Sequence, residues 1–273
     1  MTLLAQSGAT IGSILLAMAV VALVETAIPL HSGERASRAH LGPNMALTFI
    51  TFATNLFLNI TLVMSLMVLP RFGLGLLNAY PQPPVLELAV VLLGLDFSFY
   101  VAHVAMHRVP AFWNYHLVHH SDPVVDVTTT IRQHPGESVI RYAFMGAFAF
   151  ALGASPGAFA VYRTWSALNG LLEHANIRVP LWLDRLIALV STWPNMHKVH
   201  HSRNREETDT NYGNIFSFWD RIFFTFTPSS RGTDIDYGLD GLDDPSAQTL
   251  KALLGLPFRS PGKKPTGAPP EVA

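Results

Sequence analysis

Histidines at short, repeated spacings are the residues of this chain that are best suited to chemistry. Eight of the twelve histidines fall in three clusters: His103 and His107; His116, His119 and His120; and His197, His200 and His201. The second and third clusters share the pattern H-x-x-H-H. Residues three and four positions apart lie on one face of a helix, so each cluster would present its imidazoles together. The pattern predicts a metal site with several histidine ligands.

The type and number of these side chains indicate which metals they would bind. Neutral imidazole suits iron, zinc, copper and nickel. The absence of cysteine excludes disulfides, thiolate zinc sites and an intrinsic iron–sulfur cluster. Eight ligands exceed the three or four that one zinc ion uses, so we expect two metal ions to share the three boxes. Two irons there could activate O2, and the electrons would then have to come from another protein.

Two other classes of metalloprotein remain as alternatives. A membrane zinc hydrolase would be expected to carry H-E-x-x-H, whose glutamate acts as general base, and the sequence lacks this motif. A metal transporter would place its ligands near the bilayer midplane, whereas these boxes follow apolar segments and lie in polar sequence. Bound iron together with O2 consumption would indicate an oxygenase. Bound zinc without O2 consumption would indicate one of the two alternatives.

The composition indicates that the elements holding the boxes are membrane helices. Hydrophobic residues make up 49% of the chain and charged residues 14%, whereas about a quarter of a soluble domain is charged. Apolar runs at residues 11–30, 45–69 and 85–102 suit helices that cross a bilayer, which need ~20 residues. The third run leads directly into His103. We expect an all-α integral membrane bundle, and the net charge of −1 gives no indication of a nucleic-acid partner.

A further apolar region, between the second and third boxes, decides whether all the boxes can meet. Residues 142–162 as one span would put the third box on the opposite side of the membrane. The sequence Gly-Ala-Ser-Pro-Gly at 153–157 is a strong turn signal. It predicts a helical hairpin that rises over residues 140–152 and returns over 159–172, although Arg163 is unfavourable in the returning arm. The hairpin would bring His174 and the third box back to the side of the others.

Basic residues predict the orientation in the membrane. Lysine and arginine gather on the cytoplasmic side, and most of them follow the third apolar run, so we expect the histidine boxes in the cytoplasm. The predicted organisation is transmembrane helices over residues 1–102, a histidine-box catalytic region over 103–227 with its membrane hairpin near 140–172, and a poorly ordered tail over 228–273. Residues 180–190 are predicted to lie along the membrane interface.

The order and spacing of the motifs resemble the fatty acid hydroxylase / sterol desaturase superfamily of membrane non-haem di-iron oxygenases. The resemblance covers roughly residues 96–226. It is carried by the three boxes, by R-x-H-P-x-E at 132–137, by N-G and E-H within 169–174, by D-x-N-Y-G at 209–213 and by W-D at 219–220. One departure is Phe223-Phe224-Thr225, where the family often has Phe-Gly-Thr.

The resemblance implies a helical membrane fold, two iron ions, O2 as co-substrate, and hydroxylation or desaturation of a lipid. It adds His174 as a ninth ligand. His134 is a further candidate, although the proline after it favours a turn, where its role would be hydrogen bonding. We therefore predict an integral membrane di-iron oxygenase that hydroxylates, or alternatively desaturates, a fatty acyl, sterol or related lipid. Its electrons would come from a separate ferredoxin or cytochrome-type donor.

Acidic residues near the boxes have two interpretations. They could accept hydrogen bonds from the ring N–H groups of the ligands, which is a common way to orient metal-binding histidines. They could equally be solvated or helix-capping carboxylates. The residues concerned are Asp126, Glu137, Glu173 and Asp209.

The sequence also allows predictions for the environments of three polar residues outside the boxes. Asp96 lies inside a predicted span, where an ionisable group is usually functional or paired. It is two helical turns before His103 and could face the site, or it could pair with Arg132. His31 and His40 lie in a polar segment outside the boxes, and we predict that both are surface residues.

Overall fold

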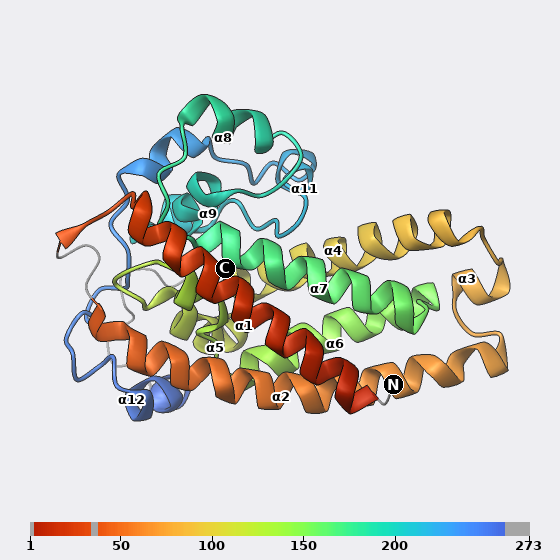
Figure 1. Cartoon of the computed structure of the whole chain (residues 1–273). Coiled ribbons are helices and arrows are strands. Elements are labelled where there is room, and N and C mark those ends of the chain that lie inside the picture. Colours follow the sequence, from red (N-terminus) through yellow and green to blue (C-terminus); the bar gives the residue numbers. More distant parts are fainter. Residues whose placement is uncertain (1–2, 34–37, 260–273) are drawn as a thin grey trace, which may run out of the picture.

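The long elements of the chain are helices that lie side by side (Figure 1). The computed structural model describes residues 3–33 and 38–259, where the only β-structure is two isolated bridges. The five long helices are α1 (Leu3–Ala27), α2 (Leu41–Val68), α4 (Pro84–Arg108), α6 (Pro135–Leu152) and α7 (Pro156–His174). Within the described residues, three segments are long and apolar enough to cross a membrane: Ser7–Ala27, Arg38–Ala79 and Pro84–Arg108. The predicted all-α membrane bundle is confirmed.

Shorter helices lie at the ends of this bundle. The turn-like helix α3 (Leu76–Ala79) joins α2 to α4 at one end. The other short helices are α5 (Pro110–His120), α8 (Leu181–Ile187), α9 (Pro194–His200), α10 (Arg205–Thr208), α11 (Phe218–Ile222) and α12 (Leu250–Gly255). In Figure 1, α5, α9 and α12 lie toward the end opposite α3. The histidine boxes belong to α4, α5 and α9, so they gather at that end.

The predicted helical hairpin is confirmed, and its turn follows from proline and glycine. Gly153 ends α6 with φ +69°, in the left-handed region that favours glycine. Ser155 then caps α7, accepting a hydrogen bond from the Ala158 N–H at 3.3 Å. A Cβ on Gly75 would collide with the backbone of Gly153, so the tip packs against the connection between α2 and α4. Because the tip lies there, α7 returns its last residue, His174, to the histidine end.

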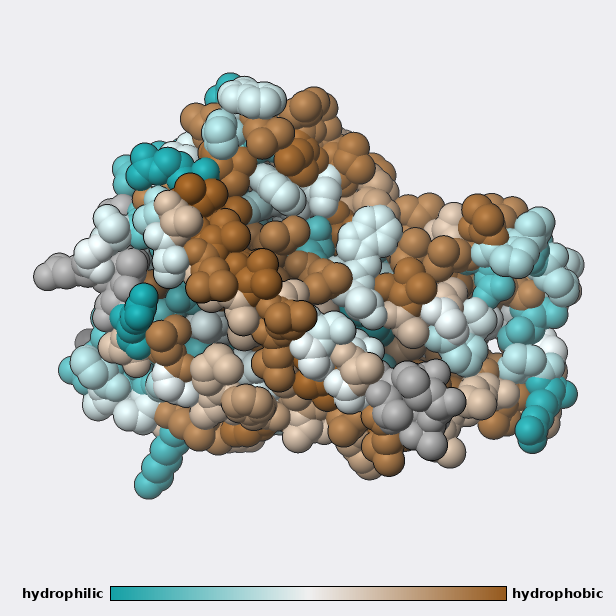
Figure 2. All heavy atoms as spheres, viewed as in Figure 1, coloured by the Kyte–Doolittle hydropathy of each residue, from teal (hydrophilic) through white to brown (hydrophobic). Residues whose placement is uncertain are grey.

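The apolar core lies between α2, α4, α6 and α7. Its buried side chains include Leu66, Leu95, Ala149 and Phe159. Large apolar residues also face outward: Leu16 and Leu23 on α1 and Phe57 on α2 are all more than half exposed. Figure 2 shows that hydrophobic residues dominate much of this face. Exposed apolar surface of this extent marks a surface for lipid or another apolar partner.

The surface of α8 continues this apolar character away from the bundle. Trp182 and Leu186 are strongly exposed, while Asp184 of the same helix is buried. Such an exposed aromatic and aliphatic face suits a helix at the membrane interface. The interfacial position of residues 180–190 stays a prediction.

Asp96 occupies neither of the positions expected from the sequence. Its carboxylate accepts hydrogen bonds from the Ile215 N–H at 3.0 Å, the Phe216 N–H at 3.1 Å and the Trp219 Nε1–H at 3.0 Å. It is fully buried against the chain after the third box, and Arg132 bonds elsewhere. Asp96 therefore fastens the loop before α11 to α4, because three N–H donors satisfy its charge within the protein.

The prediction that His31 and His40 are surface residues was wrong. Both are buried, because the segment after α1 folds back over the segments that follow α5 and α7. His40 Nδ1 lies 3.0 Å from Asp122 Oδ1, and its Nε2 lies 3.3 Å from Asp126 Oδ2. The backbone N–H of His31 donates to Asn176 Oδ1 at 2.9 Å.

The segment from residue 228 to residue 259 also differs from the expected poorly ordered tail. Helix α12 buries Leu253 against Leu47, Leu117 and Val118. Ahead of it, Gln248 is buried and accepts a hydrogen bond from Arg132 at 2.6 Å. Regularly spaced leucines at 250, 253, 254 and 256 supply the apolar face that docks this segment. Residues 260–273 of the predicted tail lie outside the described residues.

Candidate metal centre

Nine buried histidines form two adjacent groups, in each of which the possible ligand nitrogens all lie within 4.8 Å of one another. The five-histidine group consists of His103, His107, His116, His120 and His200. The four-histidine group consists of His119, His174, His197 and His201. The structure therefore brings together all eight box histidines and the ninth candidate.

Each H-x-x-H-H box is divided between the two groups. In α5, His116 and His120 belong to the five-histidine group, while His119 turns to the other. At α9 the division is reversed, because only His200 joins the five-histidine group. The groups touch directly: the ring centroids of His120 and His201 are 4.6 Å apart. The arrangement suits two metal ions side by side.

The ends of the helices and the short connection between α4 and α5 position these rings. The last two turns of α4 carry the first box, and Pro110 begins α5 only two residues after α4 ends. The connection is short, so the α4 and α5 histidines face one another. His197 and His200 of the third box lie in α9, which begins at Pro194, and His201 directly follows that helix. His174 is the last residue of α7, so the hairpin delivers a ligand candidate from a helix that no box occupies.

Backbone and carboxylate oxygens orient the rings of the five-histidine group. The Nδ1–H groups of His103 and His200 donate to the carbonyl oxygens of Tyr212 and Thr210, each at 2.8 Å. His107 Nδ1 lies 3.2 Å from Asp209 Oδ1. His116 Nδ1 lies 3.3 Å from Glu137 Oε1, but the two atoms do not form a hydrogen bond. Hydrogen-bonded oxygen partners hold Nδ1 protonated and leave Nε2 free to bind a metal.

The four-histidine group has fewer such partners among the described residues. His174 donates its Nδ1–H to the Gly170 carbonyl at 2.8 Å. His197 Nδ1 is 3.8 Å from Glu173 Oε2, beyond hydrogen-bond range. The buried Nδ1 of His119 has no hydrogen-bond partner in the described part of the chain. The rings of this group are therefore less firmly oriented.

The contacts between Nε2 atoms test whether a metal fits. The Nδ1–H of His103 donates to a carbonyl oxygen, so its Nε2 carries a lone pair. His116 Nε2 lies 3.1 Å from that atom and also 3.2 Å from His120 Nε2. In the other group, His174 Nε2 lies 3.1 Å from the Nε2 atoms of His119, His197 and His201. One ring proton can satisfy only one such contact. A cation among converging lone pairs removes the repulsion, so the donor sets fit metal ions.

Burial keeps these imidazoles in the form that binds metal. Desolvation, together with neighbouring histidines, lowers the pKa values of His119, His120, His197 and His201 well below 6.5. Desolvation also lowers the pKa of His200, to about 3. A neutral imidazole is the ligand form. These rings are ready to bind a metal ion at neutral pH without losing a proton.

His134 lies outside both groups. It is the N-cap of α6, where its Nδ1 accepts a hydrogen bond from the Gly136 N–H at 2.9 Å. Its Nε2 lies 3.3 Å from the Leu254 carbonyl oxygen. The turn role that the following proline favours is therefore the one seen.

Three of the four acidic candidates face box histidines. Oxygen atoms of Asp209, Glu137 and Glu173 lie 3.2, 3.3 and 3.8 Å from the Nδ1 atoms of His107, His116 and His197, respectively. Asp126 instead caps a 3-10 helix, where it accepts from the Thr128 N–H at 2.8 Å.

Sequence reasoning missed the carbonyl groups that orient His103 and His200. They belong to the D-x-N-Y-G segment, which is held by Asn211 with φ +56° and by Asp220. Asp220 accepts hydrogen bonds from the Tyr212 N–H at 2.7 Å and the Gly213 N–H at 2.9 Å. The nearby W-D motif was the available signal, but spacing alone does not reveal which carbonyl groups point at a histidine.

The buried Arg132 does not pair with Asp96, which was one of the two possibilities for that carboxylate. Its guanidinium donates to Asn44 Oδ1 at 2.6 Å, Ser121 Oγ at 2.9 Å and the Val118 carbonyl at 2.9 Å. Val118 lies inside the second box, and Ser121 directly follows it. Arg132 therefore fixes the carboxyl end of α5, which carries three of the nine histidines.

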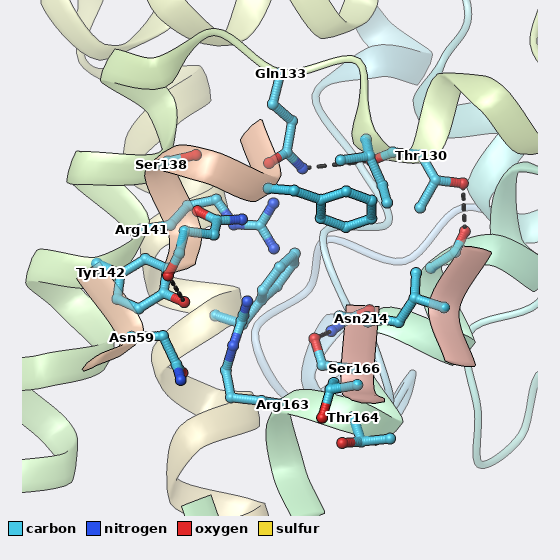
Figure 3. Close-up of a pocket in the computed structure, with 18 of the residues that line it drawn as sticks. Asn59, Thr130, Gln133, Ser138, Arg141, Tyr142, Arg163, Thr164, Ser166 and Asn214 are labelled. Carbon is cyan, nitrogen blue, oxygen red and sulfur yellow. Dashed lines mark hydrogen bonds between the residues drawn. The ribbon is translucent and has the colours of Figure 1, made fainter. Parts of the chain in front are cut away.

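A cavity of about 640 Å³ opens on both histidine groups. His103 and His116 of one group, and His119, His174 and His197 of the other, line its inner end. It extends between α1, α2, α6 and α7 as far as Pro156 at the start of α7. Its walls are mostly apolar, with several polar side chains that Figure 3 labels. A long apolar molecule in this cavity would reach the histidines from the membrane-embedded part of the bundle.

Comparisons with known proteins point to one family. A family model described as fatty acid hydroxylase matches residues 88–225, about half of the chain. An ornithine lipid hydroxylase from Rhizobium tropici is 32% identical over 178 residues, which cover 64% of this chain and 52% of the relative. No solved structure matches the chain significantly.

Alkylglycerol monooxygenases are also similar. The protein from Caenorhabditis elegans is 32% identical over 146 residues, covering 53% of this chain and 28% of the relative. The protein from Danio rerio is 32% identical over 147 residues, covering 54% and 31%. The chain thus spans between about a quarter and a half of the length of these curated relatives.

Proposed function

Because this chain belongs to the fatty acid hydroxylase family, we propose that it is an integral membrane di-iron oxygenase that hydroxylates a lipid. The observation that carries the proposal is the pair of all-histidine groups that open together on one membrane-facing cavity. Lipid hydroxylase and monooxygenase relatives support the reaction class. A pair of iron ions in such a site supplies the activation of O2 that oxidation of an unactivated C–H bond requires.

The residues of the chain would hold the metal ions, orient the histidine rings and keep water out of the site. The five-histidine group would hold one ion and the four-histidine group the other. Carbonyl oxygens of Tyr212 and Thr210 keep the Nδ1 protons of His103 and His200, so the opposite ring nitrogens stay available. All nine histidines are buried, so bulk water is kept from the reacting carbon.

Electrons and protons must balance for the proposed reaction. Hydroxylation places one oxygen atom of O2 in the product alcohol, and the other is reduced to water by taking up two electrons and two protons. The chain has no cysteine for an iron–sulfur cluster of its own. A separate ferredoxin or cytochrome-type protein is therefore the proposed donor. Desaturation on the same scaffold is the alternative, and the mass of the product separates the two reactions.

Elemental analysis of detergent-purified protein tests the proposal. We expect about two iron ions per chain, O2 consumption when a reductant and donor are supplied, and a lipid product heavier by one oxygen atom. A product lighter by two hydrogens would indicate the desaturase instead. One zinc ion per chain with no O2 consumption would contradict both oxidations and favour a hydrolase.

The cytoplasmic position of the histidine end is part of the proposal and has its own test. The chain lacks cysteine, so single cysteines can be introduced as reporters. Ser246 is exposed at the histidine end, and Gln82 is exposed near α3 at the opposite end. In sealed inside-out vesicles, Ser246→Cys should react with a membrane-impermeant maleimide, whereas Gln82→Cys should not. The reverse labelling would place the histidines outside.

A further inference from the structure

Two arginines line the cavity although it lies within the helical bundle. Arg141 comes from α6 and Arg163 from α7, and Figure 3 shows that both side chains extend into the same space. From the sequence, Arg163 counted against the hairpin because an arginine is costly in a membrane segment. The metal groups do not use it. Its position in the cavity therefore calls for a role of its own.

The surroundings of Arg163 leave its charge available to a ligand. Its guanidinium lies 5.1 Å from the centroid of the Tyr142 ring. It makes no hydrogen bond or ion pair with any residue that the structure describes. An arginine that only avoids the bilayer would extend along its helix to the interface. Arg163 instead turns inward over an aromatic ring, and its five N–H groups find no acceptor in the described part of the chain.

Arg141 is only partly neutralised. Its guanidinium lies 4.5 Å from the centroid of Phe99, and its NH1 atom is 3.7 Å from Glu137 Oε1. That carboxylate also faces His116. The other carboxylate that lines the cavity, Glu173, accepts from Asn169 Nδ2 and faces His197. Both cavity carboxylates are therefore directed at the histidines, and the region around the two arginines has an excess of positive charge.

We propose that Arg141 and Arg163 bind an oxyanion of the substrate, a carboxylate or a phosphate, so that the lipid oxidised here is an anionic amphiphile. This inference rests on the proposed function, because it names the substrate class of the same cavity. Two guanidinium groups on neighbouring helices can form charge-assisted, bidentate hydrogen bonds to such a group. Ser138, whose buried hydroxyl has no partner among the described residues, lies one turn from Arg141 and lines the same cavity.

The helix positions also indicate where the oxyanion would lie relative to the histidines. Arg163 precedes His174 by eleven residues on α7, which corresponds to ~16 Å along the helix at 1.5 Å per residue. Arg141 follows Glu137 by four residues, about 6 Å along α6. The polar end would therefore be held roughly one to three helical turns from the metal groups. The apolar part of the molecule would occupy the rest of the cavity.

Binding of defined lipids to the metal-stripped protein tests this inference. The probes share one apolar chain: oleate and oleoyl lysophosphatidic acid carry an oxyanion, whereas oleyl alcohol and mono-oleoylglycerol are neutral. Each is titrated into the full-length protein in a non-ionic detergent, and lipid retained by the protein is counted by native mass spectrometry. We expect at least one oxyanion probe to bind roughly tenfold or more tightly than the neutral probes. Whichever of the two binds better identifies carboxylate or phosphate as the group recognised.

Substitutions distinguish binding that depends on the two arginines from general affinity for lipid. Arg163→Gln and Arg141→Gln should each lower the preference for the oxyanion probe by roughly tenfold, and binding of oleyl alcohol should not change. Arg163→Lys should retain part of the preference because it keeps the charge and loses the bidentate fork. Arg185→Gln removes an exposed arginine of α8 and serves as the matched control, with wild-type binding expected.

Several outcomes would overturn the inference. Equal binding of oleate, lysophosphatidic acid and the neutral probes by the wild-type protein would do so without any variant having to fold. An unchanged preference in the double variant Arg141→Gln/Arg163→Gln would do so as well. Because the protein is free of metal, the result is independent of iron content and turnover. Failure of the oxygenase proposal would appear in the elemental analysis instead.

Discussion

The two histidine groups differ in how the chain builds them. Four of the five histidines in the five-histidine group come from α4 and α5, which are consecutive helices separated by one residue, Val109. The four-histidine group draws its members from α5, α7 and the α9 region, which lie far apart in the sequence. The first group therefore follows largely from local chain geometry. The second forms only when the hairpin and α9 have packed.

The two groups also differ in how many of their rings are oriented by a neighbouring oxygen atom. Three Nδ1 atoms of the five-histidine group lie at hydrogen-bond distance from an oxygen, against one, that of His174, in the other group. The four-histidine group contributes three of its four members to the cavity wall, and the five-histidine group two of its five. We infer that the five-histidine group is the firmly held site. The four-histidine group is more open to the substrate.

Paired histidine substitutions should have the largest effect, because they remove whole sites. His120→Ala/His200→Ala damages one group only, so about one metal ion per chain should remain. His119→Ala/His200→Ala damages both groups, and we expect almost no bound metal. The measurement is metal content by elemental analysis of equally folded preparations, as judged by circular dichroism.

A single variant sets the baseline for that comparison. His134→Ala removes a histidine outside both groups and should leave about two metal ions bound. If the two paired variants lose equal amounts of bound metal, the nine histidines form one undivided site, contrary to the grouping described above.

Changes in the surrounding carboxylates should have a smaller effect that differs between the groups. Asp209→Asn should weaken metal binding at the five-histidine group by roughly 10- to 100-fold, because the Asp209 carboxylate lies at hydrogen-bond range from His107. Glu173→Gln should have a weaker effect, since its oxygen is 3.8 Å from His197. Competition with a chelator of known affinity measures both constants. A larger loss for Glu173→Gln would reverse the ranking of the two sites.

Acidification should act on both groups alike, because burial lowers the histidine pKa values in each. The pKa values of His197 and His201 lie well below 6.5, and that of His200 is about 3. Below pH 6.5 the unfolded chain therefore binds protons that the folded, metal-free chain does not. The free energy of unfolding should fall as pH decreases, by up to about 1.4 kcal/mol per pH unit for each such histidine.

Thermal unfolding of the metal-free protein at fixed pH values checks this expectation. The melting temperature should decline steadily from pH 6.5 to pH 4.5, while it stays nearly constant between pH 7 and pH 8. A constant melting temperature down to pH 5 would show that the folded protein takes up protons as readily as the unfolded chain, contrary to the lowered pKa values.

The smallest effect is expected at Phe224, which tests whether backbone strain reaches the metal groups. Phe224 has φ +60° and is 95% exposed, so its ring packs on almost nothing. Phe224→Gly should relieve left-handed strain of about 1 kcal/mol, offset in part by the greater flexibility of the unfolded chain. We expect a shift in melting temperature of only a few degrees and unchanged metal content. Loss of metal from this variant would mean that the turn helps to hold the five-histidine group.

The departure from the family pattern noted in the sequence lies at that same residue. The family often has glycine at the position of Phe224, and the backbone there is left-handed. Local signals of this kind were interpretable: apolar runs predicted the three spans, and Gly153 with Pro156 predicted the hairpin. They could be interpreted because helix length, turn chemistry and periodicity depend on neighbours in the sequence.

Errors arose where a residue's environment is supplied by distant segments. His40 is polar in the sequence but buried, because Asp122 and Asp126 come to it from more than eighty residues away. Asp96 satisfies its charge with three N–H groups from beyond residue 214. The segment ahead of α12 is anchored by the contact of Gln248 with Arg132. No local pattern encodes such pairings.

By itself, the sequence determined the type of side chain proposed to bind metal, the clustering of the histidines and the helices that carry them. Only the tertiary structure decided how those histidines divide. His119 and His120 are adjacent, yet they serve different groups, because each residue turns a helix by about 100°. Which neighbouring helix each of these side chains contacts depends on how α4, α7 and α9 pack around α5. That packing is a property of the whole chain, and the division into two sites follows from it.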